Sequence, residues 1–363
     1  MSKFYSLTLQ KVIRQTADCV SLVFDVPTDL QNTFRFVQGQ YLILRKVIAN
    51  EDLRRSYSIC TSPLDNSLAV AIKKVNGGKF SVYAQSLQAG DQVEVMPPTG
   101  NFYVPLSPES PPRAFVAFAS GSGITPLLSI IKTTLQTEPN SQFTLFYGNR
   151  NTESIIFREE LDNLKNQFMG RFALCHILSR ESLGIPLFKG RITGEKCERF
   201  ARVFFKPTEI AAFFLCGPET MISEVSQTLQ TLGVEQKNIH FELFAPPTGK
   251  MTAKTPTQQP TIDQQTGKGF ECQVTITIDG DTFDFKLLSD AENILDAAAA
   301  AGADLPYACK GGVCCTCKAR LLEGKVTMST NYALEPEEIA AGYVLTCQAH
   351  PQTNQVRITF DEN

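Results

Sequence analysis

The sequence predicts three folded parts: an antiparallel β-barrel, an α/β domain with a parallel sheet, and a C-terminal β-grasp domain. Short apolar runs separated by turn residues fill the chain up to residue 108, which is typical of a small barrel. Strand-like and helix-like segments alternate from Arg113, which indicates a parallel sheet. After residue 270, a hairpin, a helix and a cysteine-rich loop follow one another.

The composition is that of an ordinary globular protein. The chain has 363 residues, of which 43% are hydrophobic and 20% charged, so it is long enough for two or three domains. Its start lacks the features of a signal peptide, and no apolar stretch is long enough to cross a bilayer. We therefore expect a cytoplasmic protein without membrane contact, whose 11 cysteines are free or metal-bound.

The charge is unevenly distributed along the chain. Residues 271–363 carry 14 acidic and 6 basic side chains, whereas residues 1–270 carry 23 acidic and 28 basic ones. An acidic surface keeps a domain soluble, and the opposite charge of the two parts also suggests electrostatic docking. No basic run is interleaved with aromatic residues, so nucleic-acid binding is not expected.

The strands of the first two parts are short and strongly apolar. In the barrel we expect strands at residues 21–26 and 40–44. In the α/β domain we expect buried strands at 114–119, 143–147 and 211–216.

A linker separates these parts from the C-terminal domain. Residues 246–270 are rich in Pro, Thr, Gln and Gly and nearly lack large apolar side chains, so we interpret them as flexible. Residues 273–285 then alternate around an Asp279-Gly280 turn, which predicts a hairpin. Ser289 to Glu292 read as a capping box that opens an Ala-rich helix ending at Gly302, and residues 356–360 as a last strand.

Four cysteines have the spacing of an iron–sulfur site. Cys309, Cys314 and Cys317 form a C-x₄-C-x₂-C pattern with a distant Cys347, which matches plant-type [2Fe–2S] ligands. Thiolates are soft anionic ligands for the two irons, and the Lys310-Gly-Gly loop is small enough for its N–H groups to face the sulfurs. A zinc site is the alternative, but zinc favours two C-x₂-C pairs.

Two motifs in the barrel predict a flavin site. Arg55, Tyr57 and Ser58 lie near the end of an expected strand; an arginine suits a diphosphate, a tyrosine stacks on a flavin ring, and a serine hydroxyl suits the N5 region. The second motif opens a short helical segment whose free N–H groups suit the same diphosphate. Either motif alone is more often a surface turn. The second motif consists of Gly77, Gly78, Lys79, Phe80 and Ser81.

A glycine-rich turn after the first α/β strand predicts a nucleotide site. Its glycines permit a tight turn and close approach of a pyrophosphate to a helix N-terminus, although a lone Gly-x-Gly is more often an ordinary turn. At the end of a later strand, Cys216 and Gly217 lie where open α/β sheets bind ligands. The turn residues expected at the nucleotide are Gly121, Gly123, Thr125 and Pro126.

In this order, the motifs resemble the ferredoxin–NADP reductase superfamily, followed by a plant-type ferredoxin. Segments 54–60, 95–98, 305–314 and 331–349 resemble the reductase subunits of bacterial aromatic-ring oxygenases, most closely those of phenylacetyl-CoA epoxidases. The resemblance implies an FAD-binding barrel, an NAD(P)-binding α/β domain, a linker and a [2Fe–2S] ferredoxin domain. The boundaries that it implies are 1–108, 109–245, 246–270 and 271–363.

The resemblance also implies roles for single residues. Cys216 is expected against the nicotinamide ring, with a buried structural cysteine as the alternative. Glu242 corresponds to an acidic residue near flavin and nicotinamide, so the catalytic residues implied are Ser58, Cys216 and Glu242. Phe244 is expected to cover the flavin face, and a core phenylalanine is the alternative.

Two arginines indicate NADPH over NADH. Arg150 and Arg180 each follow an expected strand, and Ser179 lies beside the second. An arginine near the adenosine ribose accommodates the 2′-phosphate, whereas solvated surface arginines are the alternative.

The implied function is an electron relay from NADP(H) through FAD and a [2Fe–2S] cluster to a separate oxygenase, expected to be a di-iron enzyme. A general ferredoxin-type reductase, or one serving a ketosteroid hydroxylase, would share these motifs. The linker and full β-grasp domain argue against the electron-transfer subunit of a dihydroorotate dehydrogenase. A non-catalytic redox sensor responding through Cys315 is a further alternative, and Cys315 could also exchange with a cluster ligand.

Overall fold

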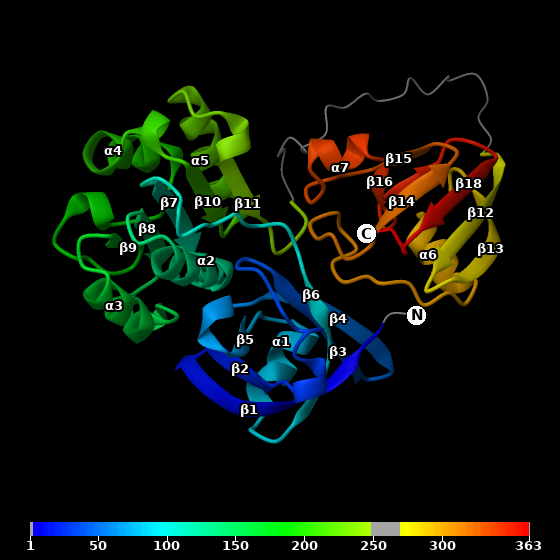
Figure 1. Cartoon of the computed structure of the whole chain (residues 1–363), viewed down its shortest axis with the longest axis horizontal. Helices are drawn as coiled ribbons and strands as arrows, with labels where there is room; N and C mark the ends of the chain where they lie inside the picture. Colours follow the sequence, from blue (N-terminus) through cyan, green and yellow to red (C-terminus); the bar gives the residue numbers. More distant parts are fainter. Residues whose placement is uncertain (1–2, 248–268, 363) are drawn as a thin grey trace. The chain divides into compact units, whose positions relative to one another are not determined.

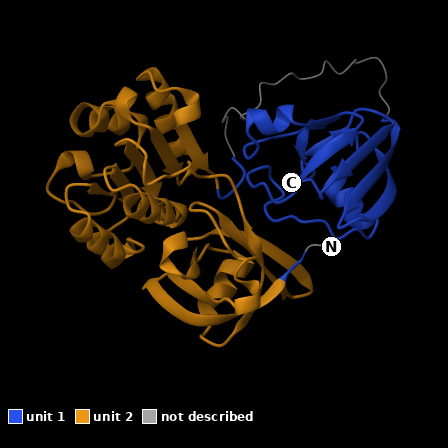
Figure 2. Cartoon of the chain, in the orientation of Figure 1, with its two compact units in different colours: residues 1–4, 244–363 blue, residues 5–243 orange. Residues whose placement is uncertain are grey.

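The computed structural model describes residues 3–247 and 269–362. The chain divides into two compact units, residues 5–243 and residues 1–4 with 244–363 (Figure 1, Figure 2). The first unit holds a barrel and a parallel sheet, and the second holds the C-terminal sheet, so the predicted fold class is confirmed. Residues 248–268 of the predicted linker lie outside the described residues.

The N-terminal part of the first unit is an antiparallel sheet of six strands in the order β4-β3-β6-β1-β2-β5. The two edge strands meet through a bridge between Ile59 and Val70 and a 2.9 Å hydrogen bond from the Cys60 N–H to the Ala69 carbonyl. This contact closes the sheet into a barrel. The strands are β1 Tyr5–Thr16, β2 Cys19–Asp25, β3 Tyr41–Ile48, β4 Glu51–Ser58, β5 Leu68–Lys73 and β6 Gln92–Thr99, with the short helix α1 Lys79–Tyr83 between the last two.

The rest of the first unit is a five-stranded parallel sheet in the order β11-β10-β7-β8-β9. Its strands β7 and β10 are almost entirely apolar because helices cover both faces. In Figure 1, α2 and α3 lie on one side of this sheet and α4 and α5 on the other. The strands are β7 Ala114–Ser120, β8 Gln142–Asn149, β9 Phe172–Leu178, β10 Ala212–Cys216 and β11 Ile239–Glu242. The helices are α2 Ile124–Thr137, α3 Arg158–Gln167, α4 Gly194–Phe204 and α5 Glu219–Thr231.

The strand order of this sheet defines where a ligand would bind. The chain runs outward from β7 through β8 to β9, then returns to place β10 on the other side of β7. Open α/β sheets bind ligands at such a switch point, outside the carboxyl ends of the strands. The turn after β7 and the end of β10 meet there.

A buried polar network packs the barrel against the α/β domain. The Ser62 hydroxyl lies 3.0 Å from that of Thr133, and the Ser129 hydroxyl donates to the Thr61 carbonyl at 2.6 Å. The Lys132 ammonium pairs with Asp65 at 2.6 Å and with Glu160 at 2.7 Å. Because buried polar groups need partners, this network fixes the orientation of the two domains.

The C-terminal unit contains a five-stranded sheet in the order β13-β12-β18-β14-β16, and a small ribbon of β15 and β17. Buried and less buried residues alternate along β12, as expected for a sheet with one face on the core. Asp279 and Gly280 have φ values of 53° and 80°, which confirms the predicted hairpin turn. The elements are β12 Glu271–Ile278, β13 Asp281–Leu288, α6 Ile294–Ala300, β14 Lys318–Glu323, β15 Val326–Met328, α7 Pro336–Ala340, β16 Tyr343–Leu345, β17 Ala349–Pro351 and β18 Gln355–Thr359.

The predicted capping box of α6 is wrong. The Ser289 hydroxyl instead accepts a hydrogen bond from the Phe270 N–H at 3.1 Å, at the end of the hairpin. The N-cap is Asn293, whose side-chain oxygen accepts from the Asp296 N–H at 3.0 Å. The helix does end before Gly302, which takes a φ of 92°.

None of the helices in the described parts of the chain is both long and apolar enough to cross a membrane.

The turn between β7 and α2 leads to a stability prediction. A Cβ atom on Gly123 would lie 2.0 Å from the Cys216 carbonyl oxygen, so Gly123→Ala must displace the end of β10. We expect this overpacking to destabilise the first unit by about 1–3 kcal/mol and to lower its urea midpoint, followed by circular dichroism. Ser122→Ala, which adds no atom to the same turn, is the matched control. Equal midpoints for Gly123→Ala and the wild type would contradict the tight contact.

Candidate functional site

The four predicted ligand cysteines converge in the C-terminal unit. The sulfurs of Cys314 and Cys309 lie 3.1 Å apart, and the Cys347 thiol is within hydrogen-bonding reach of both Cys309 and Cys317. Cys309 is half-buried and the other three are buried. Hydrogen bonds from the Cys314 and Cys347 thiols and from backbone N–H groups lower the pKa of Cys309, which favours the thiolate that binds metal.

The loop around these thiols has the shape that a cluster needs. The Gly311 N–H donates to the Cys309 sulfur at 3.4 Å. Lys310 and Gly312 have φ values of 50° and 72°, and this left-handed backbone turns N–H groups inward. A Cβ on Gly312 would lie 3.0 Å from the Thr330 carbonyl, so glycine fits best there. Four thiols with inward N–H donors fit a [2Fe–2S] group.

The Cys315 side chain makes a contact outside the group of four predicted ligand cysteines. Its thiol donates to the Ala333 carbonyl at 3.6 Å. This contact supports the choice of Cys314 and Cys317 as the ligands from this segment.

The predicted flavin residues lie at the end of β4 and around α1. The buried Ser58 is the last residue of β4 and donates a 2.8 Å hydrogen bond to the carboxylate of Glu242. Tyr57 is half-buried with its ring centroid 5.6 Å from that of Phe80. Arg55 is exposed, and its guanidinium donates to the Arg54 carbonyl. An exposed arginine, an aromatic ring and the serine of a polar pair therefore follow one another along β4.

Several residues of the second flavin motif support the local fold. The Ser81 hydroxyl accepts from the Val75 N–H at 3.1 Å and donates to the Gly78 carbonyl at 3.2 Å. Phe80 is buried, and Lys79 pairs with Glu51. Gly77 has a φ of 74°. For these side chains, direct contact with FAD stays a prediction.

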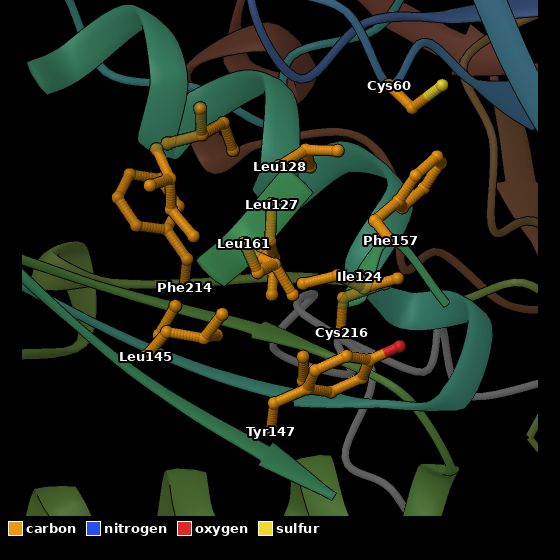
Figure 3. Packing of buried hydrophobic residues seen from close by; sticks show 14 of the residues in the cluster. Cys60, Ile124, Leu127, Leu128, Leu145, Tyr147, Phe157, Leu161, Phe214 and Cys216 are labelled. Atoms are coloured by element: carbon orange, nitrogen blue, oxygen red, sulfur yellow. The ribbon is translucent and has the colours of Figure 1, made fainter. Parts of the chain in front are cut away.

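Glu242 and Cys216 end neighbouring parallel strands and are partners in register. Burial raises the pKa of the Glu242 carboxyl to about 7, while the hydrogen bond from Ser58 lowers it. Burial, followed by the charge of Glu242, raises the pKa of the Cys216 thiol. Figure 3 shows Cys216 beside Ile124 and Tyr147 in the core. Its fully buried position fits the structural alternative, so its contact with nicotinamide stays a prediction.

The glycine-rich turn is shaped by packing of the chain on itself. Besides Gly123, Gly217 also needs its small size, because its Cβ would lie 3.0 Å from that of Ser120. The Thr125 hydroxyl donates to the Ser122 carbonyl at 3.0 Å, and Pro126 is buried in α2. These contacts explain the residue types without a nucleotide. The turn nevertheless lies at the predicted switch point.

The two candidate phosphate-binding arginines lie on adjacent strand ends. The Arg180 N–H donates to the Arg150 carbonyl at 2.8 Å, and the Ser179 N–H donates to the Asn149 carbonyl at 3.0 Å. Both arginines are exposed. The Glu181 carboxylate accepts 2.7 Å hydrogen bonds from the N–H and the hydroxyl of Thr152, which joins the two loops.

Phe244 follows the end of β11 and is 48% exposed. It belongs to the second compact unit. Its predicted place on the flavin stays a prediction.

Three residues of the nucleotide region were missed by the sequence analysis. The buried Tyr147 hydroxyl donates to the Gly121 carbonyl at 3.0 Å and holds the glycine-rich turn. Lys73 lies at the end of β5, with its ammonium 4.0 Å from the position of a Cβ on Gly121. The Nδ2 of Asn149 is buried and has no hydrogen-bond partner of normal geometry among the described residues. Asn149 precedes Arg150 at the end of a strand. This position is the one signal in the sequence that could have identified Asn149 as a candidate site residue.

Comparisons with known proteins identify all three domains. Residues 6–103 match an oxidoreductase FAD-binding domain, residues 118–227 an oxidoreductase NAD-binding domain and residues 276–352 a 2Fe-2S iron-sulfur cluster binding domain. The chain is similar to phthalate dioxygenase reductase, with a TM-score of 0.57, 21% identity and 98% of both chains covered. It is also similar to an intact type IV self-sufficient cytochrome P450 monooxygenase, with a TM-score of 0.69, 19% identity and coverage of 98% of this chain and 41% of the other. These two likenesses concern the fold.

Relatives with higher sequence identity show which family the chain belongs to. The chain is 46% identical to one of the subunits of 1,2-phenylacetyl-CoA epoxidase from Escherichia coli K12, over 99% of both chains. It is 34% identical to the ferredoxin reductase component of 3-ketosteroid-9-alpha-monooxygenase from Rhodococcus rhodochrous, over 99% of this chain and 97% of that one. The chain therefore belongs to the family of NAD(P)H-dependent flavin and iron–sulfur oxidoreductases that deliver electrons to oxygenases.

Proposed function

We propose that this chain carries electrons from NADPH through FAD and a [2Fe–2S] cluster to a phenylacetyl-CoA epoxidase whose oxygenase component is a di-iron enzyme. The observation that carries the proposal is the 46% identity to the Escherichia coli epoxidase component over almost the whole of both chains. We propose a cytoplasmic location, supported by the 11 cysteines, none of which forms a disulfide in the described residues, because a reducing compartment preserves thiols.

An oxygenase acting on a ketosteroid is the second candidate acceptor. The 34% identity to a 3-ketosteroid-9-alpha-monooxygenase component supports it, over a similar share of the chain. The cofactor sites would be the same in both cases. The difference in identity favours the epoxidase.

The barrel residues have distinct proposed tasks toward FAD. The exposed Arg55 would hold the diphosphate, the half-buried Tyr57 would stack on the ring, and the N–H groups of residues 77–81 would assist with the diphosphate. When bound, a flavin accepts a hydride from nicotinamide and passes on single electrons.

The Ser58–Glu242 pair is the polar centre of the proposed hydride-transfer site. The pair links the barrel to the α/β domain through one 2.8 Å hydrogen bond. With a pKa of about 7, the Glu242 carboxyl exists in both its neutral and its charged form near neutral pH. Groups that handle protons in catalysis commonly have such a pKa. We therefore propose that the pair orients the ring that accepts the hydride and adjusts the local charge.

For the nucleotide, we propose that the two adjacent arginines hold the 2′-phosphate of NADPH and that Ser179 assists them. The backbone bond between Arg150 and Arg180 and the Glu181 contacts with Thr152 keep the two arginines on adjacent strand ends at one edge of the sheet. The buried Asn149 amide and the Lys73 ammonium are added as candidate nucleotide contacts, with Lys73 assigned to the pyrophosphate because it lies near the glycine-rich turn.

Removal of either arginine tests the nucleotide assignment. Arg180→Ala and Arg150→Ala should each raise KM for NADPH about ten- to hundredfold, because a charge-assisted hydrogen bond contributes about 1.5–3 kcal/mol. KM for NADH should change little, since NADH lacks the phosphate. Arg202→Ala, which removes an exposed arginine of α4 paired with Glu198, is the control. If the ratio of the KM for NADPH to the KM for NADH is unchanged in both variants, the assignment is refuted.

Reconstitution with an oxygenase tests the proposed acceptor. NADPH, this chain and purified phenylacetyl-CoA epoxidase oxygenase subunits should together convert phenylacetyl-CoA and dioxygen to the epoxide. Omission of the chain should abolish the reaction. The rate should fall at high ionic strength, because charge complementarity that speeds docking is screened by salt.

A parallel mixture with a 3-ketosteroid oxygenase distinguishes the two acceptors. Faster turnover with the epoxidase supports the proposal. If the chain reduces the ketosteroid oxygenase rapidly and leaves the epoxidase unreduced, the acceptor is misassigned.

A further inference from the structure

Gln348 directly follows the predicted ligand Cys347, and its side chain crosses the cysteine loop. Its Nε2 lies 3.6 Å from the Cys347 sulfur, 2.8 Å from the Cys347 carbonyl and 3.2 Å from the Lys310 carbonyl. One amide group therefore contacts the fourth ligand and the loop that carries the first.

The orientation of this amide is fixed from the other side. The Thr330 hydroxyl donates to the Gln348 Oε1 at 2.8 Å, so the oxygen is occupied and the nitrogen faces the sulfur and the two carbonyls. The backbone of Gln348 is held too, because its N–H donates to the Leu345 carbonyl and its carbonyl accepts from the Ser329 N–H, each at 2.9 Å. The donor is thus held by contacts on its amide oxygen and on its backbone.

A donor at this position has an electronic consequence. Reduction adds negative charge to a cluster and its sulfur ligands, and an N–H···S hydrogen bond stabilises that charge more in the reduced state than in the oxidised state. Hydrogen bonds to the sulfurs are among the factors that set the potentials of iron–sulfur clusters. Neighbours of ligands also hold the ligands in place.

We propose that Gln348 is a positioning residue of the [2Fe–2S] site, which raises the reduction potential of the cluster through its hydrogen bond to Cys347 and holds the ligand loop through the Lys310 carbonyl. The proposal rests on the assignment of Cys309, Cys314, Cys317 and Cys347 as the ligands.

The test compares two glutamine variants of the full-length holoprotein. Gln348→Leu should lower the midpoint potential measured by electron paramagnetic resonance during a redox titration. Loss of a hydrogen bond predicts a change of about two- to tenfold in the reduction equilibrium, or about 20–60 mV for one electron. Gln352→Leu is the matched control, because the Gln352 side chain donates to the Thr327 hydroxyl. It should leave the potential unchanged.

A milder variant covers the case in which Gln348→Leu fails to incorporate a cluster. Thr330→Val frees the Gln348 amide and should lower the potential by a smaller amount. Electron–nuclear double resonance should also detect an exchangeable proton in the wild type that is missing in Gln348→Leu. A wild-type protein without a [2Fe–2S] signal would refute the ligand assignment itself. A normal wild-type signal with unchanged potentials in both variants would overturn the role of Gln348 alone.

Discussion

The hydrogen bond between Ser58 and Glu242 connects the ends of two strands that belong to different domains and are 184 positions apart in the sequence. It can form only because the network around Ser62, Lys132 and Thr133 orients the barrel on the α/β domain. Burial of Glu242 at this junction raises its pKa to about 7. The position of the proposed flavin residues relative to the carboxyl edge of the parallel sheet therefore depends on this contact together with the network that orients the two domains.

The same edge of the sheet shows how packing and ligand binding make similar demands on sequence. Gly123 and Gly217 allow the β7 turn to approach the end of β10, and Tyr147 holds the Gly121 carbonyl. This leaves a compact turn at the switch point, where a pyrophosphate can approach backbone N–H groups. The cysteine loop is constructed differently, because its residues lie close in sequence and need only one distant partner, Cys347. One-electron chemistry thus has a self-contained site in the C-terminal unit.

The fold was predictable where local pattern determines structure. Alternation in β12 reflects burial on one face of its sheet, and the apolar strand β10 of the parallel sheet reflects burial on both faces. The Asp279-Gly280 turn reflects the positive φ values that these residue types accept. The capping box failed because the Ser289 hydroxyl bonds to Phe270, across the hairpin. Cysteine spacing predicted a thiol cluster that the structure brings together. Lys73 and Tyr147 could not be predicted, because their partners come from distant segments. Gln348 is next to Cys347, but its orientation is set by Thr330 and Lys310 from other segments.

Rapid mixing of NADPH with the full-length protein without oxygen tests the relay most directly. Flavin absorbance and the cluster's paramagnetic signal would be followed together, in the wild type and in Cys317→Ser. The account predicts that the flavin bleaches first and that the cluster signal then appears at a rate independent of protein concentration. In Cys317→Ser the flavin should still bleach, without a cluster signal. Cluster reduction before flavin bleaching, or at a rate proportional to protein concentration, would contradict an intramolecular relay from flavin to cluster.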